Sequence, residues 1–319
     1  MDPLERKRVG HTSLLVTRLG IGGAPLGNEY RSVTDMEVDA TITEAIGRGI
    51  RYIDTAPLYG RGRSESRLGR YFATHRKPAD LVLSTKVGRI LRQEGGAGDQ
   101  APLYDYSEEG VRKSFESSLQ RLGPDMTIDI LYIHDPDEHY QEAISQAYKA
   151  LAELRATGRV KAIGAGMNQW EMELRFAREG DFDCFLQAGK YTLLDQSADE
   201  KFLPYCQEKG IGVIIGAPFG YGVLATDLRH GARPVVSVPA ATLERALEID
   251  AVCARHDVPL RAAALQFILA HPAITSVIPG SQTKEEMHEN FEMIQYDIPG
   301  ELWDDLKQEK LIMETAPTP

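Results

Sequence analysis

Apolar residues follow two alternating patterns along the chain. Short, continuous apolar runs alternate with longer segments in which apolar residues recur every three or four positions. A short run predicts a strand that is buried on both faces, and the longer period predicts an amphipathic helix. The predicted strands are residues 19–22, 51–54, 81–86, 128–134, 160–164, 184–188, 211–216 and 276–279. The predicted helices are residues 33–48, 64–73, 107–122, 140–157, 169–178, 200–209, 240–255, 260–269, 284–293 and 299–310.

The order of these elements predicts an α/β fold. Each connection between strands is long enough for a crossover helix, which favours parallel pairing. Eight such units close most economically into a (β/α)8 TIM barrel, and a doubly wound open sheet is the alternative. A turn between short apolar runs predicts an N-terminal β-hairpin over residues 7–16, placed to cover the bottom of the barrel. We therefore expect one domain over residues 1–319, with extra C-terminal helices.

Composition and charge exclude several classes of protein. Hydrophobic residues make up 42% of the 319 positions, which is too high for a disordered chain. The 36 Lys and Arg residues against 47 Asp and Glu give a net charge of −11, which argues against nucleic acid or anionic lipid as a partner. The N-terminus has no signal-peptide pattern and no run is long enough to span a membrane, so we expect a cytoplasmic protein. The three cysteines lie far apart, which predicts reduced thiols.

Ionisable residues fall at the ends of three successive predicted strands. Asp54 closes the second strand, Lys86 the third and His134 the fourth, and Tyr59 follows in the loop after Asp54. Taken singly, these residues also fit a turn former, a solvated strand end, a core histidine and a rim aromatic. Their coincidence matters because barrel enzymes carry their chemistry at the C-terminal ends of strands.

Together the four residues make up a proton-transfer site. A phenol is too weak an acid to serve as a base at neutral pH, and we expect a nearby Lys86 ammonium to lower the pKa of Tyr59. A carboxylate at Asp54 would keep that ammonium charged, and a neutral His134 would orient a substrate oxygen. The chain shows no spacing of metal ligands and no nucleophile beside a base, so we expect no metal.

Several motifs carry a resemblance to a known family. They are residues 54–60 (DTAPLYG), 64–65 (SE), 68–69 (LG), 84–86 (STK), 132–134 (YIH), 277–280 (VIPG) and 289–290 (EN). In order and spacing they resemble the aldo-keto reductase family, over residues 7–311. The resemblance implies a (β/α)8 barrel, hydride transfer between a nicotinamide and a carbonyl or alcohol, and a catalytic tetrad of Asp54, Tyr59, Lys86 and His134.

The resemblance also implies a cofactor site. Its residues would be Gly23, Ala24, Asp54, Asn168, Ala217, Phe219, Tyr221, Gly280, Ser281, Gln282, Glu286, Glu289 and Asn290. Met167 stands where many members have serine, and the usual glutamine falls on Ala188, with Gln187 one residue out of register. Such a slip turns a strand side chain to the other face. Gly216 replaces an aromatic residue, and whether Gln187, Phe219 or Tyr221 contacts the nicotinamide stays open.

One position bears on the choice of cofactor. Members that use NADPH place a cation after the eighth strand, and here that position is Glu286, with Lys284 nearby on the surface. A carboxylate repels a 2′-phosphate and accepts hydrogen bonds from a free ribose hydroxyl. We therefore expect NAD, with NADP disfavoured.

Further motifs indicate a branch of the family. Residues 134–137 (HDPD), 164–168 (GAGMN), 188–194 (AGKYTLL) and 316–319 (APTP) resemble NAD-dependent aldose dehydrogenases, which oxidise C1 of L-fucose or D-threo-aldoses to a lactone. Pyridoxal 4-dehydrogenase and L-galactose dehydrogenase are similar relatives of this branch. The alternatives are an NADPH-dependent carbonyl reductase and a non-catalytic subunit that senses nicotinamide. The expected partner is a small sugar or aldehyde, bound by a monomer or a homodimer.

Overall fold

Eight parallel strands form a barrel in the computed structural model, which describes residues 1–91, 103–124, 126–232, 234 and 236–319. The strands pair in chain order, as predicted. Isolated parallel bridges, Leu19 to Val277 and Gly22 to Gly280, join the two edge strands and close the sheet. The barrel strands are β3 (Ile21–Gly22), β4 (Tyr52–Asp54), β5 (Val82–Val87), β8 (Ile130–His134), β9 (Ala162–Met167), β10 (Cys184–Ala188), β11 (Gly212–Gly216) and β12 (Ile274–Ile278).

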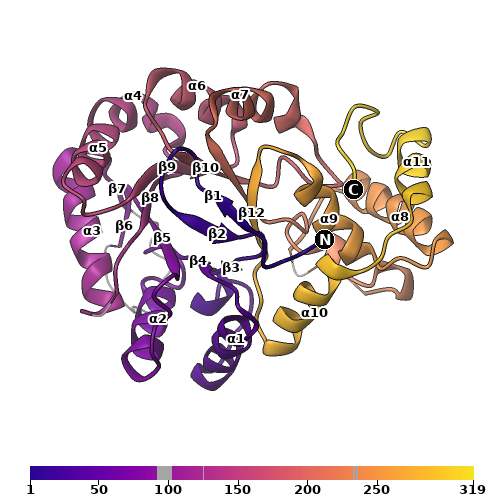
Figure 1. The fold of residues 1–319 in the computed structure, drawn as a ribbon, viewed down its shortest axis with the longest axis horizontal. Coiled ribbons are helices and arrows are strands. Elements are labelled where there is room, and N and C mark those ends of the chain that lie inside the picture. Colours follow the sequence, from indigo (N-terminus) through magenta and orange to yellow (C-terminus); the bar gives the residue numbers. More distant parts are fainter. Residues whose placement is uncertain (92–102, 125, 233, 235) are drawn as a thin grey trace.

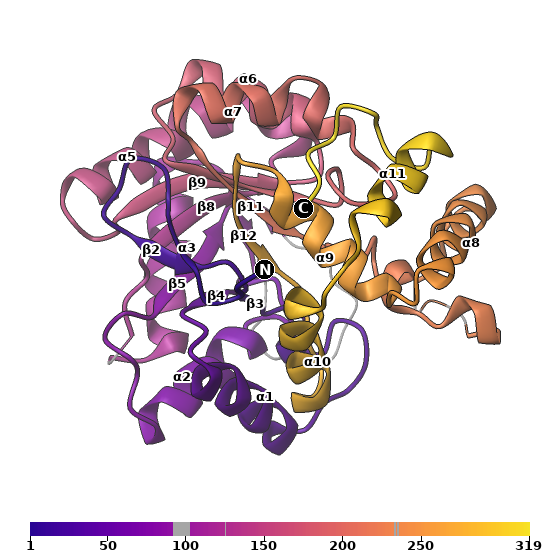
Figure 2. The ribbon, with the colours of Figure 1, turned by 45° about the vertical axis from the view of Figure 1, so that its right-hand side comes forward.

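Helices surround the barrel on its outer side (Figure 1). They are α1 (Asp35–Arg48), α2 (Arg63–Thr74), α3 (Glu108–Leu122), α4 (Tyr140–Glu142), α5 (Tyr148–Ala156), α6 (Trp170–Glu179), α7 (Phe202–Lys209), α8 (Ala240–Arg255), α9 (Leu260–Ala270), α10 (Lys284–Gln295) and α11 (Gly300–Gln308). The sequence predicted one regular helix over 140–157, whereas a π-helical turn, Ala143–Ala147, separates α4 from α5. Helices α8 and α11 pack together beside the barrel (Figure 2).

The predicted N-terminal hairpin is present. Strands β1 (Arg6–Arg8) and β2 (Leu15–Thr17) pair antiparallel and lie across the barrel (Figure 1). Val9, Leu14 and Val16 are buried in one apolar cluster with inward-facing residues of the barrel strands, among them Tyr52 and Ile130. The hairpin therefore closes the N-terminal end of the barrel, as the sequence indicated.

Strand alternation divides the side chains into an inner and an outer set. On β8, Ile130 and Tyr132 face the interior cluster, whereas Leu131 and Ile133 pack in the larger core between strands and helices. The same parity continues to His134, which therefore faces the barrel axis. Strand β9 runs three residues beyond its predicted end at 164. A Cβ at Gly164 would lie 2.3 Å from the Cys184 carbonyl oxygen, so this glycine allows close strand packing and does not mark a turn. The sequence also predicts a long loop after the third strand, functional or disordered, with a glycine-rich patch at residues 95–100. That patch lies outside the described residues.

A second hairpin stands after β5. Strands β6 (Arg89–Ile90) and β7 (Leu103–Tyr104) pair antiparallel at the C-terminal end of the barrel. This hairpin comes from the long segment that the sequence predicted to be a functional or disordered loop.

Candidate active site

The four predicted catalytic side chains meet at the C-terminal end of the barrel. Asp54, Lys86 and His134 all lie at inward-facing positions of neighbouring strands, and they line one cavity with Tyr59. The parity that buries Tyr52 and Tyr132 below them places Asp54 and His134 on the same inner face, two residues further along each strand.

A tight turn positions Tyr59. Gly60 follows it with φ of +60°, and a Cβ at this position would lie 1.9 Å from the carbonyl oxygen of Gly27. Only glycine fits such a conformation and approach. The Gly60 backbone N–H donates to Glu29 Oε1 at 2.6 Å, which fixes the turn against the preceding loop. The requirement for glycine directly after Tyr59 is therefore steric.

Lys86 connects the acid and phenol groups. Its Nζ donates to Asp54 Oδ2 at 2.5 Å, to the Thr55 carbonyl oxygen at 2.9 Å and to Tyr59 Oη at 3.2 Å. The side chains of Lys86 and Asp54 are each 2% exposed. A buried ammonium with three acceptors at these distances is well matched to its hydrogen-bonding capacity.

A buried polar chain supports Asp54 from below. Ser84 Oγ donates to Asp54 Oδ1 at 2.6 Å, and Tyr52 Oη lies 3.1 Å from Ser84 Oγ and 3.3 Å from Tyr132 Oη. Cys184 Sγ donates to Tyr132 Oη at 3.5 Å. These contacts fix the carboxylate so that its second oxygen faces Lys86.

Electrostatics in the site correct one expectation. Burial raises the pKa of Tyr59 to about 12, and the nearby Lys86 ammonium lowers it only in part. The sequence argument weighed the ammonium and omitted the loss of solvent, which disfavours the charged phenolate. Burial works to lower the pKa of Lys86, but Asp54 and Tyr59 together outweigh it and leave that pKa raised. Burial, with Lys86 and Arg89, holds the pKa of His134 well below its ordinary value, so the imidazole is neutral.

The cavity has a volume of about 450 Å³, within the range of small-molecule sites. It is lined by all four catalytic candidates and by ten of the predicted cofactor residues: Ala24, Asp54, Asn168, Ala217, Phe219, Tyr221, Gly280, Gln282, Glu286 and Asn290.

Three other predicted cofactor residues do not line the cavity. Gly23 packs against the backbone of Asp54, where a Cβ would meet the carbonyl oxygen at 2.5 Å. Ser281 is buried and donates to the sulfur of Met287, and Glu289 pairs with Arg261. A resemblance assigns residues by position alone, whereas here Gly23 packs against backbone and the side chains of Ser281 and Glu289 contact protein partners.

The Gln187 side chain lies on the outer face of β10, as its one-residue shift in register predicted. Its Nε2 donates to the carbonyl oxygens of Asn168 and Ala188, and its Oε1 accepts from the Lys190 backbone N–H at 2.9 Å. Gln187 therefore shapes the loop behind Asn168. Asn168 itself lines the cavity and donates to Tyr221 Oη at 2.5 Å.

The far end of the cavity has groups that fit a dinucleotide. Asn290 Oδ1 is buried there with no hydrogen-bond donor among the described residues. Such an unmet acceptor suits a donor such as the amino group of a nucleotide base. At the start of α10, Glu286 Oε2 accepts from the Gln282 backbone N–H at 2.7 Å, and Gln282 Oε1 accepts from Arg31 Nε at 2.7 Å. Lys284 is exposed and faces Glu285.

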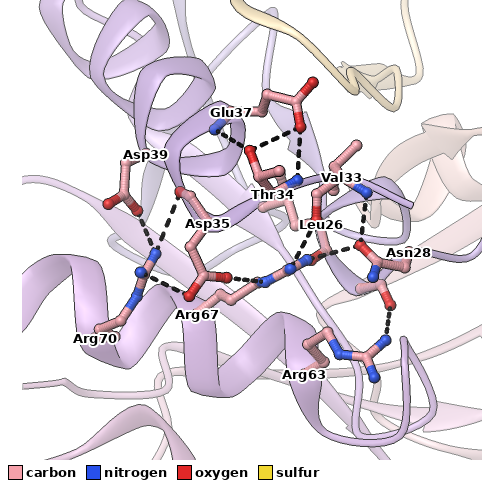
Figure 3. Close-up of polar contacts among 11 residues, drawn as sticks. Leu26, Asn28, Val33, Thr34, Asp35, Glu37, Asp39, Arg63, Arg67 and Arg70 are labelled. Atoms are coloured by element: carbon pink, nitrogen blue, oxygen red, sulfur yellow. Dashed lines mark hydrogen bonds and ion pairs between the residues drawn. The ribbon is translucent and has the colours of Figure 1, made fainter. Parts of the chain in front are cut away.

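The loop after β3 forms one wall of the cavity, and Arg67 holds it in place (Figure 3). The Arg67 guanidinium donates to the carbonyl oxygens of Leu26 and Val33, at 2.7 and 2.8 Å, and to Asn28 Oδ1 at 2.8 Å. Tyr30 lies within this loop and lines the cavity. Figure 3 shows Arg67 reaching the loop from α2.

Sequence reasoning missed several cavity residues. Arg89, Asp135, Tyr30 and Arg261 all line the cavity. Asp135 carried a signal, since it follows His134 directly in the chain. The other three lie on a hairpin, a loop and a helix whose positions depend on tertiary packing.

A closed parallel barrel that brings a buried acid–ammonium–phenol group and a neutral histidine into one cavity is suited to proton transfer at a carbonyl or alcohol, as in (β/α)8 oxidoreductases. Comparison with known proteins makes the assignment specific. Residues 18–309 match the aldo/keto reductase family, and the chain belongs to it. Members of this family use nicotinamide cofactors.

Individual relatives cover almost the whole chain. It is 40% identical to D-threo-aldose 1-dehydrogenase of a Pseudomonas species, over 96% of each sequence. It is 37% identical to pyridoxal 4-dehydrogenase of Microbacterium luteolum, over 97% of this chain and 98% of the relative. An aldo-keto reductase of Bacillus halodurans shares the fold with a TM-score of 0.78 at 22% identity, over 98% of each chain.

Cys184, Cys206 and Cys253 are free and buried. Within the described ranges, no group of three His, Cys, Asp or Glu side chains is arranged to hold a metal ion. None of the helices described there is long and apolar enough to cross a membrane.

Proposed function

We propose that this protein oxidises an aldose at C1 with NAD, giving a lactone and NADH. The observation that carries the proposal is the joining of Asp54, Lys86, Tyr59 and His134 in one cavity. The name of the D-threo-aldose 1-dehydrogenase relative supports the substrate class. Pyridoxal, named in the other relative, is the second candidate, since it also presents an aldehyde within reach of hydroxyl groups.

The geometry suggests a role for each group. Tyr59 Oη takes the proton from the anomeric hydroxyl in oxidation and returns it in reduction. Lys86 stabilises the phenolate that forms, and Asp54 keeps Lys86 charged and oriented. His134, held neutral, orients the reacting oxygen through Nε2. The bound nicotinamide supplies the acceptor for the hydride that leaves C1.

A sugar panel with isotopic labelling tests this function. Purified enzyme with NAD is offered L-fucose, L-galactose, D-arabinose and pyridoxal, and NADH formation is followed by absorbance. The preferred sugar is then supplied with deuterium at C1, and the label is expected in the reduced cofactor. Oxidation without deuterium in the cofactor, or no sugar oxidised, contradicts the proposal.

Cofactor choice forms a separate part of the proposal. We assign NAD rather than NADP because Glu286 lines the cavity near the start of α10, where a carboxylate repels a 2′-phosphate. Two unit charges about 4 Å apart interact by about 4 kcal/mol at an effective dielectric near 20, and a quarter of this gives roughly fivefold discrimination. Arg31 donates to Gln282 in the same region and Arg261 lines the cavity, and their positive charges oppose this effect.

Dissociation constants for the two cofactors test the role of Glu286. The parent is expected to bind NAD more tightly, and Glu286→Arg is expected to move the ratio toward NADP. Lys284→Glu serves as the control, since Lys284 is exposed on the same helix turn and does not line the cavity. A parent that prefers NADP, or an arginine variant with an unmoved ratio, shows that Glu286 is not the selector.

A further inference from the structure

An ion pair between Arg89 and Asp135 lies on the cavity wall beside His134, and the proposed proton transfer gives it no role. Arg89 Nη1 donates to Asp135 Oδ2 at 2.6 Å, and the same oxygen is 3.5 Å from His134 Nε2. The Arg89 and Asp135 side chains are 19% and 23% exposed, and both line the cavity. The pair is therefore partly desolvated and still open to a ligand.

The surroundings hold Asp135 in a fixed and unusual conformation. Its φ is +40°, which few residues other than glycine, asparagine and aspartate adopt. Tyr106 Oη lies 2.7 Å from the carbonyl oxygens of both His134 and Asp135, so it fixes this turn. The Asp135 backbone N–H donates to the Gly166 carbonyl oxygen on the neighbouring strand at 3.1 Å. A costly turn at a cavity wall often has a functional reason.

Arg89 is held with similar precision. Its guanidinium carbon lies 5.6 Å from the centre of the Tyr104 ring, on the partner strand of the same hairpin. Tyr104 in turn stacks on His139 at 5.4 Å between ring centres. The hairpin and the loop after β8 thus meet at the Arg89–Asp135 pair.

The pair keeps unused hydrogen-bonding capacity. A guanidinium carries five N–H groups, and Arg89 makes one hydrogen bond among the described residues, with a buried Nε left unmet. Asp135 Oδ1 accepts no hydrogen bond from the described residues. A neighbouring acceptor and donor match a hydroxyl group, which donates one hydrogen bond and accepts others.

We propose that Arg89 and Asp135 recognise, by hydrogen bonding, a hydroxyl group on the carbon next to the reacting carbon. With the reacting oxygen held by His134, a substituent one carbon away would fall beside the Asp135 carboxylate, whose Oδ1, among the described residues, is free to accept a hydrogen bond. That hydroxyl donates to Asp135 and accepts from Arg89. The pair then determines specificity for 2-hydroxy aldehydes and their hemiacetals over plain aldehydes. The inference rests on the proposed function, since it concerns the substrate of the same site.

Paired small aldehydes test the inference without requiring that any sugar be oxidised. The enzyme is assayed in reduction with NADH, with glyceraldehyde and with propanal, which has the same carbon chain without hydroxyl groups. The readout is the ratio of kcat/KM for the two aldehydes. Hydration of each aldehyde in water cancels when this ratio is compared between parent and variant.

Asp135→Asn is the informative variant, because asparagine keeps the shape and tolerates a positive φ. We expect the ratio to fall at least tenfold, equivalent to about 1.4 kcal/mol, because a charged acceptor for the hydroxyl is lost. Arg89→Gln is expected to lower the ratio in the same direction. Asp137→Asn is the matched control: it lies two residues away, also has a positive φ of 38°, and does not line the cavity.

The outcomes separate recognition from a purely structural role. If the pair only stabilises the hairpin or orients His134, Asp135→Asn lowers kcat/KM equally for both aldehydes. The ratio then stays constant, which overturns the proposal. A parent that shows no preference for glyceraldehyde, or that reduces neither aldehyde, also overturns it. Failure of the aldose assay with an intact aldehyde ratio contradicts the proposed function alone.

Discussion

Tyr59 shows how burial and charge oppose each other at a single residue. Lys86 Nζ lies 3.2 Å from its hydroxyl oxygen, yet loss of solvent dominates and the pKa rises to about 12. The phenol therefore stays protonated in the free enzyme at neutral pH. A protonated phenol is ready to donate in reduction, whereas oxidation requires the minor ionised form.

Removal of the phenol hydroxyl tests its role. Tyr59→Phe keeps the ring and is expected to lower kcat by about 10²–10⁴-fold, the usual contribution of a positioned acid or base. The dissociation constant for NAD should change little. Steady-state kinetics and a cofactor titration measure the two effects. Residual activity within about tenfold of the parent would falsify the assignment, since tenfold corresponds to only about 1.4 kcal/mol of barrier.

The raised pKa of Tyr59 also predicts the pH dependence. In oxidation the active base is the phenolate, which is populated above a pKa of about 12, so log kcat/KM should rise by about one for each pH unit through the neutral and alkaline range. Reduction uses the phenol and should stay level there. His134, with its pKa well below the ordinary value, adds no further step in this range. An oxidation profile that levels off near neutral pH would contradict this reading.

At the scale of elements, strand parity explains what the sequence could predict. Asp54, Lys86 and His134 lie near the ends of neighbouring strands, in step with the inward-facing residues below them, so a period of two suffices to bring them together. The register of β10 likewise turned Gln187 away from the cavity.

Other features depended on contacts between distant elements. Arg89 reaches the cavity through a hairpin that pairs β6 with β7, and Asp135 faces it through a turn with positive φ. Neither hydrophobic period nor spacing encodes these directions. The raised pKa of Tyr59 depends on burial by the whole cavity, which a list of neighbouring charges omits.

The loop after β3 offers a test at this scale. Arg67→Lys leaves several of the four acceptors of the guanidinium unmet, two of them backbone carbonyls, and is expected to lower the free energy of unfolding by about 1–3 kcal/mol. NAD affinity should also fall, since the same loop carries Tyr30. Urea denaturation and a cofactor titration measure both.

Arg70→Lys is the matched control for this change. Arg70 also comes from α2 and contacts Asp35 and Asp39, but its side chain is 42% exposed (Figure 3). Exposed ion pairs contribute at most about 1 kcal/mol. Equal destabilisation by the two lysine variants would show that Arg67 does not anchor the loop.

At the scale of the molecule, one continuous apolar core fills the layer between the barrel strands and the helices. Residues from nearly every helix and from the outer faces of the strands belong to one buried cluster, and the hairpin adds to the second, inner one. Such packing favours the expectation of one domain over residues 1–319.

The two tryptophans provide a test of that expectation. Trp170 lies on α6 and Trp303 on α11, and both are buried. Trp170→Phe and Trp303→Phe each leave a single tryptophan as the fluorescent reporter. The urea midpoints of the two fluorescence signals should coincide with each other and with the loss of activity. Separate midpoints would indicate two cooperative units. Light scattering on the same samples distinguishes a monomer from a homodimer.

The closure of one barrel end has a consequence for the order of events in turnover. Val9, Leu14 and Val16 fill the N-terminal end, so two ligands that react with each other share the passage at the opposite end. Access from one end favours an ordered exchange, in which the ligand bound nearer the opening leaves before the other. We therefore expect product release to contribute to the rate at saturating concentrations, as it does in many enzymes.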